Sequence, residues 1–567
     1  MKSSAKSTKI ADVKQAPQLQ WWHWALGVLL TFLVAFEVYG PALNGEFLFD
    51  DSYLPFMTTQ VAEGPLSGWL GVRPALMISY WLNYQSSGLE PYPYHVVGVL
   101  LHVLNAFLAG FIVRRLLSWV GEMGWMREAL SIFAGAIFLL HPVQTESVAY
   151  VTSRSETMSV FFFLCAYAVF VYRRTESITM MRAIVVILLF GLACSVKEHT
   201  TVLPALLLLT DYYFVTPFRF IGIRRNLKLY GPIAIGAVFG VIAVFSVLQR
   251  ADSAGFAIKD FTWYEYLFTQ FRVIWLYLRL YVAPFGQNGD YAWEASRSIL
   301  DGGALFGLIG LLALAFLAWK YRREFPMASF GYFGFLILLA PTSSIVPIRD
   351  VAVERRMYLP FICLLFITVD LLRRWKTSRT VMIGVMAVVS LVAGVASYQR
   401  NHVWASALAF WEDITAKSPN NARARFQLAY AQWQDGKCEE SVANYERVAK
   451  MEKPDDRLLI DWALALECAN KPDEGVAKVR EAMQQQPTAH GYSVIGMIYG
   501  KRGRVDEALE ALSAAEKLDP NFEMTYVYRG NIFASRRQMP MAASEYRKAL
   551  AINPNNAAAQ QGLSLAR

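Results

Sequence analysis

The sequence is poor in charge: Asp, Glu, Lys and Arg make up 17% of its 567 residues, whereas apolar residues make up 55%. Together with a mean hydropathy of +0.30, this composition argues against a soluble enzyme of the same length. The five cysteines form no CxxC or other metal-binding spacing. A disulfide framework is therefore not expected, although a bridge between Cys438 and Cys468 stays open if that region lies outside the cytoplasm.

The sequence also lacks a basic segment interleaved with stacking aromatic residues, so its net charge of +9 does not point to nucleic acid. From Asn401 onward Lys+Arg and Asp+Glu each number 21, and the whole basic excess lies in the first 400 residues. Such an excess in an apolar region is typical of cytoplasmic loops that face anionic membrane lipid. A cleavable signal peptide is not expected either, because residues 1–20 read as a basic cytoplasmic leader before the first apolar run.

Long apolar runs predict an all-α protein whose first part is a polytopic membrane helical bundle of about eleven spans. Alternation of Lys/Arg clusters fits eleven crossings if residues 264–281 form an interfacial helix, because Arg272 and Arg279 fall seven residues apart on one helix face. The predicted domains are a basic leader over 1–20, a membrane domain over 21–400 and an outer C-terminal domain over 401–567. The predicted outer loops are 41–92, 142–155, 197–200, 249–301 and 342–355.

Internal repetition marks the C-terminal domain. A period near 34 residues is that of the tetratricopeptide repeat, which is a pair of antiparallel helices, so about four repeats and an α-solenoid with a concave face are predicted. Small residues such as Gly496 and Ala508 are expected where the two helices of a pair approach closely. The period is visible in the prolines, which recur every 33 to 35 residues, at Pro419, Pro454, Pro487, Pro520 and Pro554.

Polar residues near membrane helices are costly, which makes them candidates for function. In the predicted orientation they gather on the outer side. Each alone has an ordinary explanation, such as a helix cap for the acidic pair or a packing role for a histidine; the concentration of carboxylates and cations on one side is the informative feature. The candidate site residues are Asp50, Asp51, Arg73, His95, His141, Glu146, Arg154, Lys197, Glu198, Arg355, Arg356 and Tyr358.

This set of residues suits transfer of a sugar from a lipid phosphate. The lipid phosphate is already a good leaving group, so no strong general acid is needed. Arg or Lys would hold the phosphate, and forked hydrogen bonds from Arg are the best for that purpose. A carboxylate would take the proton of the attacking hydroxyl group.

The same motifs resemble a known family. Asp50-Asp51 in the first outer loop resembles the acidic motif of the GT-C superfamily of polyprenyl-phosphate-sugar-dependent transferases. Further motifs along nearly the whole chain resemble the transmembrane and tetratricopeptide-repeat-containing protein O-mannosyltransferases and their bacterial relatives. These motifs are Arg73-Pro74, Leu82-Asn83-Tyr84, Tyr94-His95, residues 141–146, 153–156, 197–198, 341–344 and 354–360, and Arg400-Asn401 with Trp404.

The resemblance implies an inverting, metal-independent transfer of mannose from dolichyl-phosphate mannose to Ser or Thr hydroxyl groups of a protein that the repeats recruit. It also implies that Asp50 or Asp51 is the base. Contacts to the donor would come from Arg73, Arg154, Lys197 and Arg355 or Arg356. A bacterial relative would use undecaprenyl phosphate and sit in the inner membrane with periplasmic repeats, whereas a eukaryotic one would sit in the endoplasmic reticulum membrane with lumenal repeats.

Three alternatives stay open. An enzyme of the same fold could act on a glycan or lipid acceptor, or transfer a preassembled oligosaccharide as a ligase does. The chain could instead be a non-enzymatic membrane scaffold that uses its repeats alone. A metal-dependent variant is also possible, with Asp50 and Glu198 or Glu354 as ligands of Mg²⁺ or Mn²⁺. The sequence names neither the sugar nor the acceptor, and it does not decide between the two aspartates, whose side chains diverge on a regular backbone.

Overall fold

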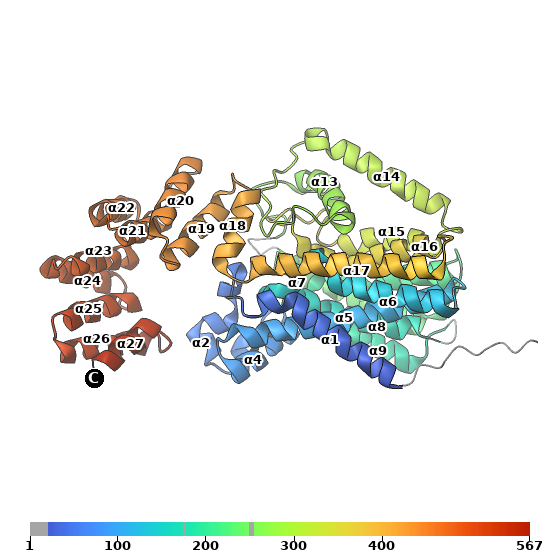
Figure 1. The fold of residues 1–567 in the computed structure, drawn as a ribbon, viewed down its shortest axis with the longest axis horizontal. Helices are drawn as coiled ribbons and strands as arrows, with labels where there is room; N and C mark the ends of the chain where they lie inside the picture. The colour runs from blue at the N-terminus through green and yellow to red at the C-terminus, as the bar shows by residue number, and fades with distance from the viewer. Residues whose placement is uncertain (1–20, 174–176, 249–253, 567) are drawn as a thin grey trace, which may run out of the picture.

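The computed structural model describes residues 21–173, 177–248 and 254–566. The predicted leader at 1–20 lies outside these residues. The described chain is all-helical, with one isolated bridge between Ala254 and Ile348 and no strand among these residues, which confirms the all-α part of the predicted fold class. Its long helices run side by side along the long axis of the molecule, and the smaller helices of the C-terminal region continue from one end (Figure 1).

The helices of the bundle are apolar on most sides, because they pack against neighbouring helices or against lipid. Their lengths differ widely. The long ones are α1 (Trp21–Leu43), α5 (Pro91–Trp119), α8 (Arg154–Val171), α12 (Leu227–Leu248), α14 (Ala304–Lys320) and α17 (Arg379–Asn401). The shorter ones are α6 (Gly124–Leu140), α9 (Met180–Val196), α10 (Leu203–Thr210), α15 (Pro326–Leu339) and α16 (Phe361–Leu372).

Five stretches among the described residues are long and apolar enough to cross a membrane, and a sixth is counted if one bent pair is a single span. The chain is thus a membrane protein, but eleven crossings are not confirmed, because several helices are shorter than about 20 residues. The five are Ala25–Leu43, Pro91–Trp119, Val151–Val171, Asp301–Lys320 and Arg379–Trp404; the bent pair is Gly124–Leu140 with Pro142–Ala149; three shorter apolar helices are Met180–Val196, Pro326–Leu339 and Phe361–Leu372.

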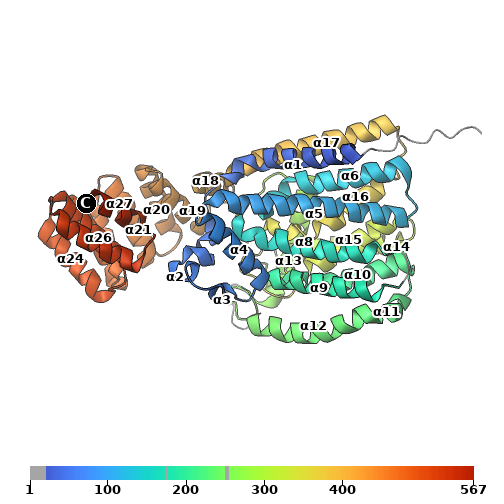
Figure 2. The same cartoon turned by 90° about the horizontal axis from the view of Figure 1, so that it is seen from below.

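The helices break at the end of the bundle that faces the C-terminal region, which we call the repeat-side end (Figure 2). There the chain turns by 50° between α6 and the segment Pro142–Ala149, which includes α7 (Thr145–Ala149). Pro142 favours this turn because it disfavours a helical conformation of His141 before it. Two more short turns, η5 (Glu198–Val202) and η8 (Glu354–Met357), stand between apolar helices. Most of the polar motifs therefore lie at helix breaks.

Helix α13 (Trp263–Val282) covers the segment predicted to be interfacial, and it is not among the five candidate spans. Its two arginines are occupied by the loop that follows it. Arg272 donates to the Glu294 carbonyl and to Ser296 Oγ, and Arg279 donates to the Phe285 carbonyl. Whether this helix crosses the membrane stays a prediction.

The C-terminal region is a stack of antiparallel helix pairs, as the proline period predicts. Small residues stand where the pairs close: a Cβ atom added at Gly496 would lie 2.6 Å from Leu512 Cγ, and one at Gly530 would lie 2.6 Å from Tyr546 Cε1. The pairs are α19 (Ala422–Gln434) with α20 (Cys438–Met451), α21 (Asp456–Cys468) with α22 (Pro472–Gln485), α23 (Ala489–Lys501) with α24 (Val505–Leu518), and α25 (Glu523–Ser535) with α26 (Met539–Ile552), followed by α27 (Ala557–Leu565).

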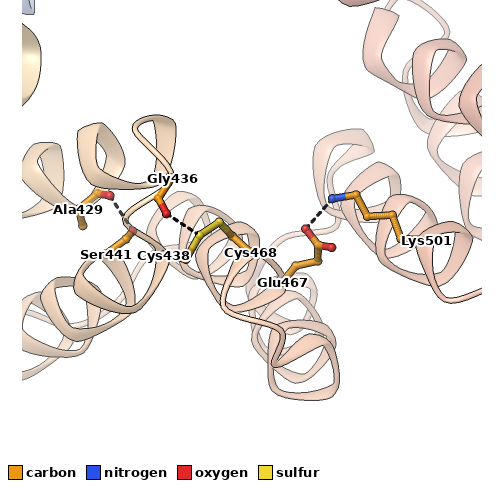
Figure 3. Close-up of a disulfide and its surroundings, with 7 residues drawn as sticks. All are labelled: Ala429, Gly436, Cys438, Ser441, Glu467, Cys468 and Lys501. Carbon is orange, nitrogen blue, oxygen red and sulfur yellow. Dashed lines mark hydrogen bonds and ion pairs between the residues drawn. A yellow bond between two sulfur atoms is a disulfide. The ribbon is translucent and has the colours of Figure 1, made fainter.

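A disulfide joins Cys438 and Cys468, so the alternative that the sequence left open is the one found (Figure 3). The bridge links the start of α20 to the end of α21 and thereby ties the first helix pair to the second. Ser441 Oγ donates to the Ala429 carbonyl beside it, and Lys501 pairs with Glu467 at 2.8 Å (Figure 3). The free cysteines among the described residues are Cys165, Cys194 and Cys363 in the bundle.

Candidate functional site

The two adjacent aspartates have different surroundings. Asp51 is 1% exposed, and its carboxylate accepts from Thr152 N at 2.7 Å, from Thr152 Oγ1 at 2.5 Å and from Leu48 N at 3.0 Å. Burial raises the pKa of Asp51 to about 7, although these hydrogen bonds oppose the shift. Asp51 therefore fixes the first loop to η4 (Val151–Ser153), and both of its oxygens are occupied.

Asp50 is half-buried, and no hydrogen bond or ion pair among the residues that the structure describes engages its carboxylate oxygens. Its backbone is fixed instead, because Asp50 N donates to Tyr150 Oη at 2.8 Å. The preceding residue, Phe49, has a φ of +52°, a conformation that costs a bulky residue energy and persists only where its neighbours enforce it. The loop thus holds an accessible carboxylate on a strained backbone, which is a common feature of functional sites.

Three ion pairs lie at the same end of the bundle. Arg73 forms a fork with Glu198, with distances of 3.1 Å from Nε and 2.6 Å from Nη2. Lys197 Nζ lies 2.5 Å from Glu156 Oε1, and Arg355 Nη1 lies 2.6 Å from Glu146 Oε1. All of these residues come from helix breaks or from helix ends, so their charges are placed where the apolar helices stop.

The three pairs form one electrostatic cluster, which we call the charge cluster (Arg73, Glu146, Glu156, Lys197, Glu198 and Arg355). The charges of Glu156, Arg73 and Arg355 all act on Lys197, whose pKa is lowered by burial more than Glu156 raises it. Burial would raise the pKa of Glu198, but the Arg73 fork outweighs it and lowers that pKa to about 2.

Tyr150 connects the charge cluster to Asp50. The guanidinium carbon of Arg355 lies 5.9 Å from the centre of the Tyr150 ring, and the Tyr150 hydroxyl group accepts the hydrogen bond from Asp50 N. The ring also stacks on Trp404 at 5.9 Å. An accessible carboxylate and three cations are thus brought together at one end of the bundle.

Several predicted site residues form hydrogen bonds inside the membrane domain and support its structure. Arg154, 2% exposed, donates to the Ser79 and Tyr94 carbonyls at 3.2 Å and 3.1 Å and lies against the Tyr80 ring. His95 Nε2 lies 3.1 Å from the Gly45 carbonyl.

The other three residues are also engaged by their neighbours. His141 Nε2 lies 3.0 Å from the Tyr281 carbonyl. Arg356 donates to the carbonyls of Val351 and Asp350. Tyr358 Oη contacts His102 Nδ1 and Asn105 Nδ2. These residues support the loops and helices around the charge cluster.

A metal site is not evident in the part of the chain that the structure describes: no group of three or more His, Cys, Asp and Glu side chains could hold an ion. Glu354, one of the two carboxylates considered as a partner of Asp50 for a metal, accepts from Gln287 Nε2, Asn288 N and Tyr291 Oη at 2.6 to 2.7 Å. Glu198, the other, is paired with Arg73.

Sequence reasoning missed Phe49, Tyr150 and Thr152 as parts of the site. Tyr150 and Thr152 lie between two motifs that were singled out, residues 141–146 and 153–156. That position was a usable signal. Phe49 carried none, since its backbone conformation cannot be read from its identity.

Comparison with known proteins places the chain among named homologues. Residues 494–557 match the model of the tetratricopeptide repeat family. The protein O-mannosyl-transferase Tmtc1 of Drosophila melanogaster is 26% identical over 334 residues, 49% of this chain and 37% of that protein. The protein O-mannosyl-transferase F38B6.6 of Caenorhabditis elegans is 22% identical over 452 residues, 75% of this chain and 62% of that protein.

This chain therefore spans less than two thirds of the length of these relatives. Among solved structures, the TPR protein YrrB, described as having an unusual peptide-binding site, is 18% identical with a TM-score of 0.22, over 31% of this chain and 87% of that one. The homologues are consistently named protein O-mannosyl-transferases, in agreement with the resemblance found in the sequence, and the C-terminal region contains tetratricopeptide repeats.

Proposed function

We propose that the chain is a membrane glycosyltransferase that moves mannose from a polyprenyl-phosphate donor to Ser or Thr hydroxyl groups of a protein, with inversion at the anomeric carbon. The observation that carries this proposal is the position of Asp50. Its carboxylate oxygens accept no hydrogen bond among the described residues. Its backbone N donates to Tyr150, whose ring lies beside Arg355 of the charge cluster. The names of the homologues support a protein acceptor and mannose as the sugar.

The proposed reaction needs two functions from these residues. Arg73 and Lys197 bind the donor phosphate, because both are cations at the repeat-side end. Each is paired with a carboxylate, Glu198 or Glu156, which the phosphate replaces. The acceptor oxygen attacks the anomeric carbon, the bond between that carbon and the phosphate oxygen breaks, and Asp50 takes the hydroxyl proton. Polyprenyl phosphate leaves with the electron pair, so neither a metal ion nor a strong acid is required.

Asp51 is not the base in this mechanism. Its two oxygens already accept three hydrogen bonds from Thr152 and Leu48, so a substrate hydroxyl group would have to displace them. Its structural role is to join the first loop to η4.

The proposed location is a bacterial inner membrane with periplasmic repeats, or the endoplasmic reticulum membrane with lumenal repeats for a eukaryotic protein. The Cys438–Cys468 disulfide supports this orientation, because disulfides persist in oxidising compartments. The polyprenyl tail would lie in the membrane beside the apolar helices, and the repeats would recruit the acceptor to the repeat-side end.

The test is transfer of labelled mannose from a synthetic polyprenyl-phosphate mannose to a Ser/Thr-rich peptide by the purified full-length protein in detergent. Asp50→Asn should lower kcat by about a hundredfold or more, as expected for loss of a general base. Asp51→Asn should lower the melting temperature, and Glu63→Gln, an exposed carboxyl group on the same loop, should change neither.

Full activity of Asp50→Asn would overturn the assignment of the base. No transfer by folded wild type to any peptide, but transfer to a glycan or lipid acceptor, would overturn the protein acceptor in favour of the glycan reading. No transfer with any donor or acceptor would favour the scaffold reading.

A further inference from the structure

Arg423, in the first turn of α19, contacts three separate loops at the repeat-side end of the bundle. Its guanidinium forms a fork with Asp290, with distances of 2.9 Å from Nε to Oδ2 and 2.6 Å from Nη2 to Oδ1. Nη2 also donates to Asp350 Oδ1 at 3.1 Å. One side chain of the first repeat therefore binds two separate loops of the membrane domain.

The same guanidinium lies over a third loop. Its central carbon is 5.2 Å from the centre of the Phe49 ring. The Phe49 ring also meets Trp411 of α18 (Ala407–Lys417) edge to face, with ring centres 5.7 Å apart. The ring of Phe49 is thus held by two side chains of the C-terminal region, and the residue after it is Asp50.

The partners of Arg423 are themselves fixed. Asp290 is 6% exposed, and its backbone carbonyl accepts from Asn421 Nδ2 at 3.4 Å. Lys417 Nζ donates to the Gln287 carbonyl and Asn288 Nδ2 donates to Ser418 Oγ, so the loop around Asp290 is bound to α18 and α19 at several points. Arg423 acts on Phe49 from a rigid support, because its anchors are themselves held in place.

The strained backbone of Phe49 gives this contact its importance. A φ of +52° is strained for a bulky residue, and the surrounding structure has to maintain it. Asp50 N is bound by Tyr150 on one side. The Phe49 side chain is bound by Arg423 and Trp411 on the other, so these contacts together define where the Asp50 carboxylate points.

We propose that Arg423 is a positioning residue that holds Phe49 in its left-handed conformation and thereby couples the docking of the first repeat to the placement of Asp50. The expected change in kcat rests on the proposed function, whereas the expected change in the structure of the first loop does not. It makes the first repeat part of the transfer site, in addition to any role in binding an acceptor.

The experiment compares Arg423→Ala, Arg423→Lys and Arg504→Ala in the full-length protein. Arg504 is a matched control, since its contacts with Glu507 and with the Tyr499 ring both lie within the third helix pair. The acceptor is a short Ser/Thr peptide, so that recruitment by the repeats does not enter. Arg423→Ala should lower kcat by about a hundredfold, the effect of a displacement of about 1 Å, with KM for the donor and for the peptide unchanged. Arg423→Lys should restore part of the lost kcat, because it keeps the cation near Phe49 and Asp290.

Hydrogen exchange of residues 44–57 provides a readout that does not depend on activity. Arg423→Ala should increase exchange there by about tenfold or more, whereas Arg504→Ala should leave it unchanged. Unchanged exchange and an unchanged kcat in Arg423→Ala would overturn the proposal, as would a rise in KM alone. Faster exchange in a protein whose wild type transfers no sugar would support the coupling while overturning the proposed function.

Discussion

Arg73 and Glu198 form a two-point fork, in which Nε and Nη2 of the guanidinium lie 3.1 Å and 2.6 Å from the two carboxylate oxygens. In the proposed reaction, a donor phosphate would take the place of this carboxylate. The side chains are 34% and 53% exposed, so the fork is open to a ligand. Glu198 is in this sense an internal substitute for the phosphate, and binding of the donor would exchange one anion for another.

Mutation of this fork tests the exchange. Arg73→Lys should raise the KM for the donor by about tenfold, because lysine keeps the charge but cannot form a fork with a phosphate. Glu198→Gln should lower that KM, since the guanidinium would no longer be occupied by a competing anion. Initial rates as a function of donor concentration provide the measurement, and the reverse order of the two KM values would contradict this role.

Removal of the disulfide should weaken the repeats. Cys438→Ser removes a link between residues separated by 30 positions, which is expected to cost about 3 kcal/mol. Thermal unfolding of the full-length protein followed by circular dichroism should show an earlier transition, and reductant should reproduce it in the wild type. Cys165→Ala is the control, because Cys165 is unpaired and reductant should still act on that variant.

Asp461 should make the stability of the repeats depend on pH. It is 8% exposed, and burial raises its pKa from 3.8 to about 6. Between about pH 4 and pH 6 the folded chain holds a proton that the unfolded chain has lost, so stability falls as pH rises through this window. The full loss, present above pH 6, is about 2–3 kcal/mol.

Asp461→Asn should remove this dependence. Its melting temperature above pH 6 should exceed that of the wild type, and the difference should disappear near pH 4. The protection factors of α21 in hydrogen exchange, which remove the intrinsic pH dependence of the exchange rate, give the local measurement. Protection factors in the wild type that are the same at pH 4.5 and pH 7 would show that Asp461 is not the source.

The close approach of the helices predicts a steric effect in the repeats. Gly496→Ala places a methyl group 2.6 Å from Leu512 Cγ, which should destabilise the third helix pair by about 1–3 kcal/mol. Gly384→Ala in α17, where an added Cβ meets nothing within 4 Å, is the matched control and should not lower the melting temperature. Equal melting temperatures for the two variants would argue against this packing.

Features with a local cause could be predicted from the sequence. The prolines at a period near 34 and the small residues at Gly496 and Ala508 predict helix pairs, because each repeat closes with its own residues. The number of crossings stays a prediction, because it has no such local cause. Helices such as α16, with 12 residues, and the 50° bend after α6 depend on how neighbouring segments pack.

The same distinction applies to the site. Gathering of charged motifs on one side follows from the high cost of charge within a membrane. Two contacts in the site form only in the tertiary structure. Arg73 pairs with Glu198, 125 residues away in the sequence, and Thr152 donates to Asp51, 101 residues away, and not to Asp50. No local pattern distinguishes two adjacent aspartates, so the difference in their hydrogen bonding emerges only from the folded chain.

Under the proposed function, the junction between α17 and α18 would limit which residues of an acceptor are modified. Helix α17 passes through the short turn η9 (His402–Trp404) to α18, and Arg400 pairs with Asp413 across the turn at 2.7 Å. The repeats therefore follow the membrane domain without a long linker, in contact with the loop that carries Asp50. An acceptor held by the repeats would then receive its sugars at a fixed number of residues from the segment that is bound, and serines or threonines outside that interval would be left unmodified.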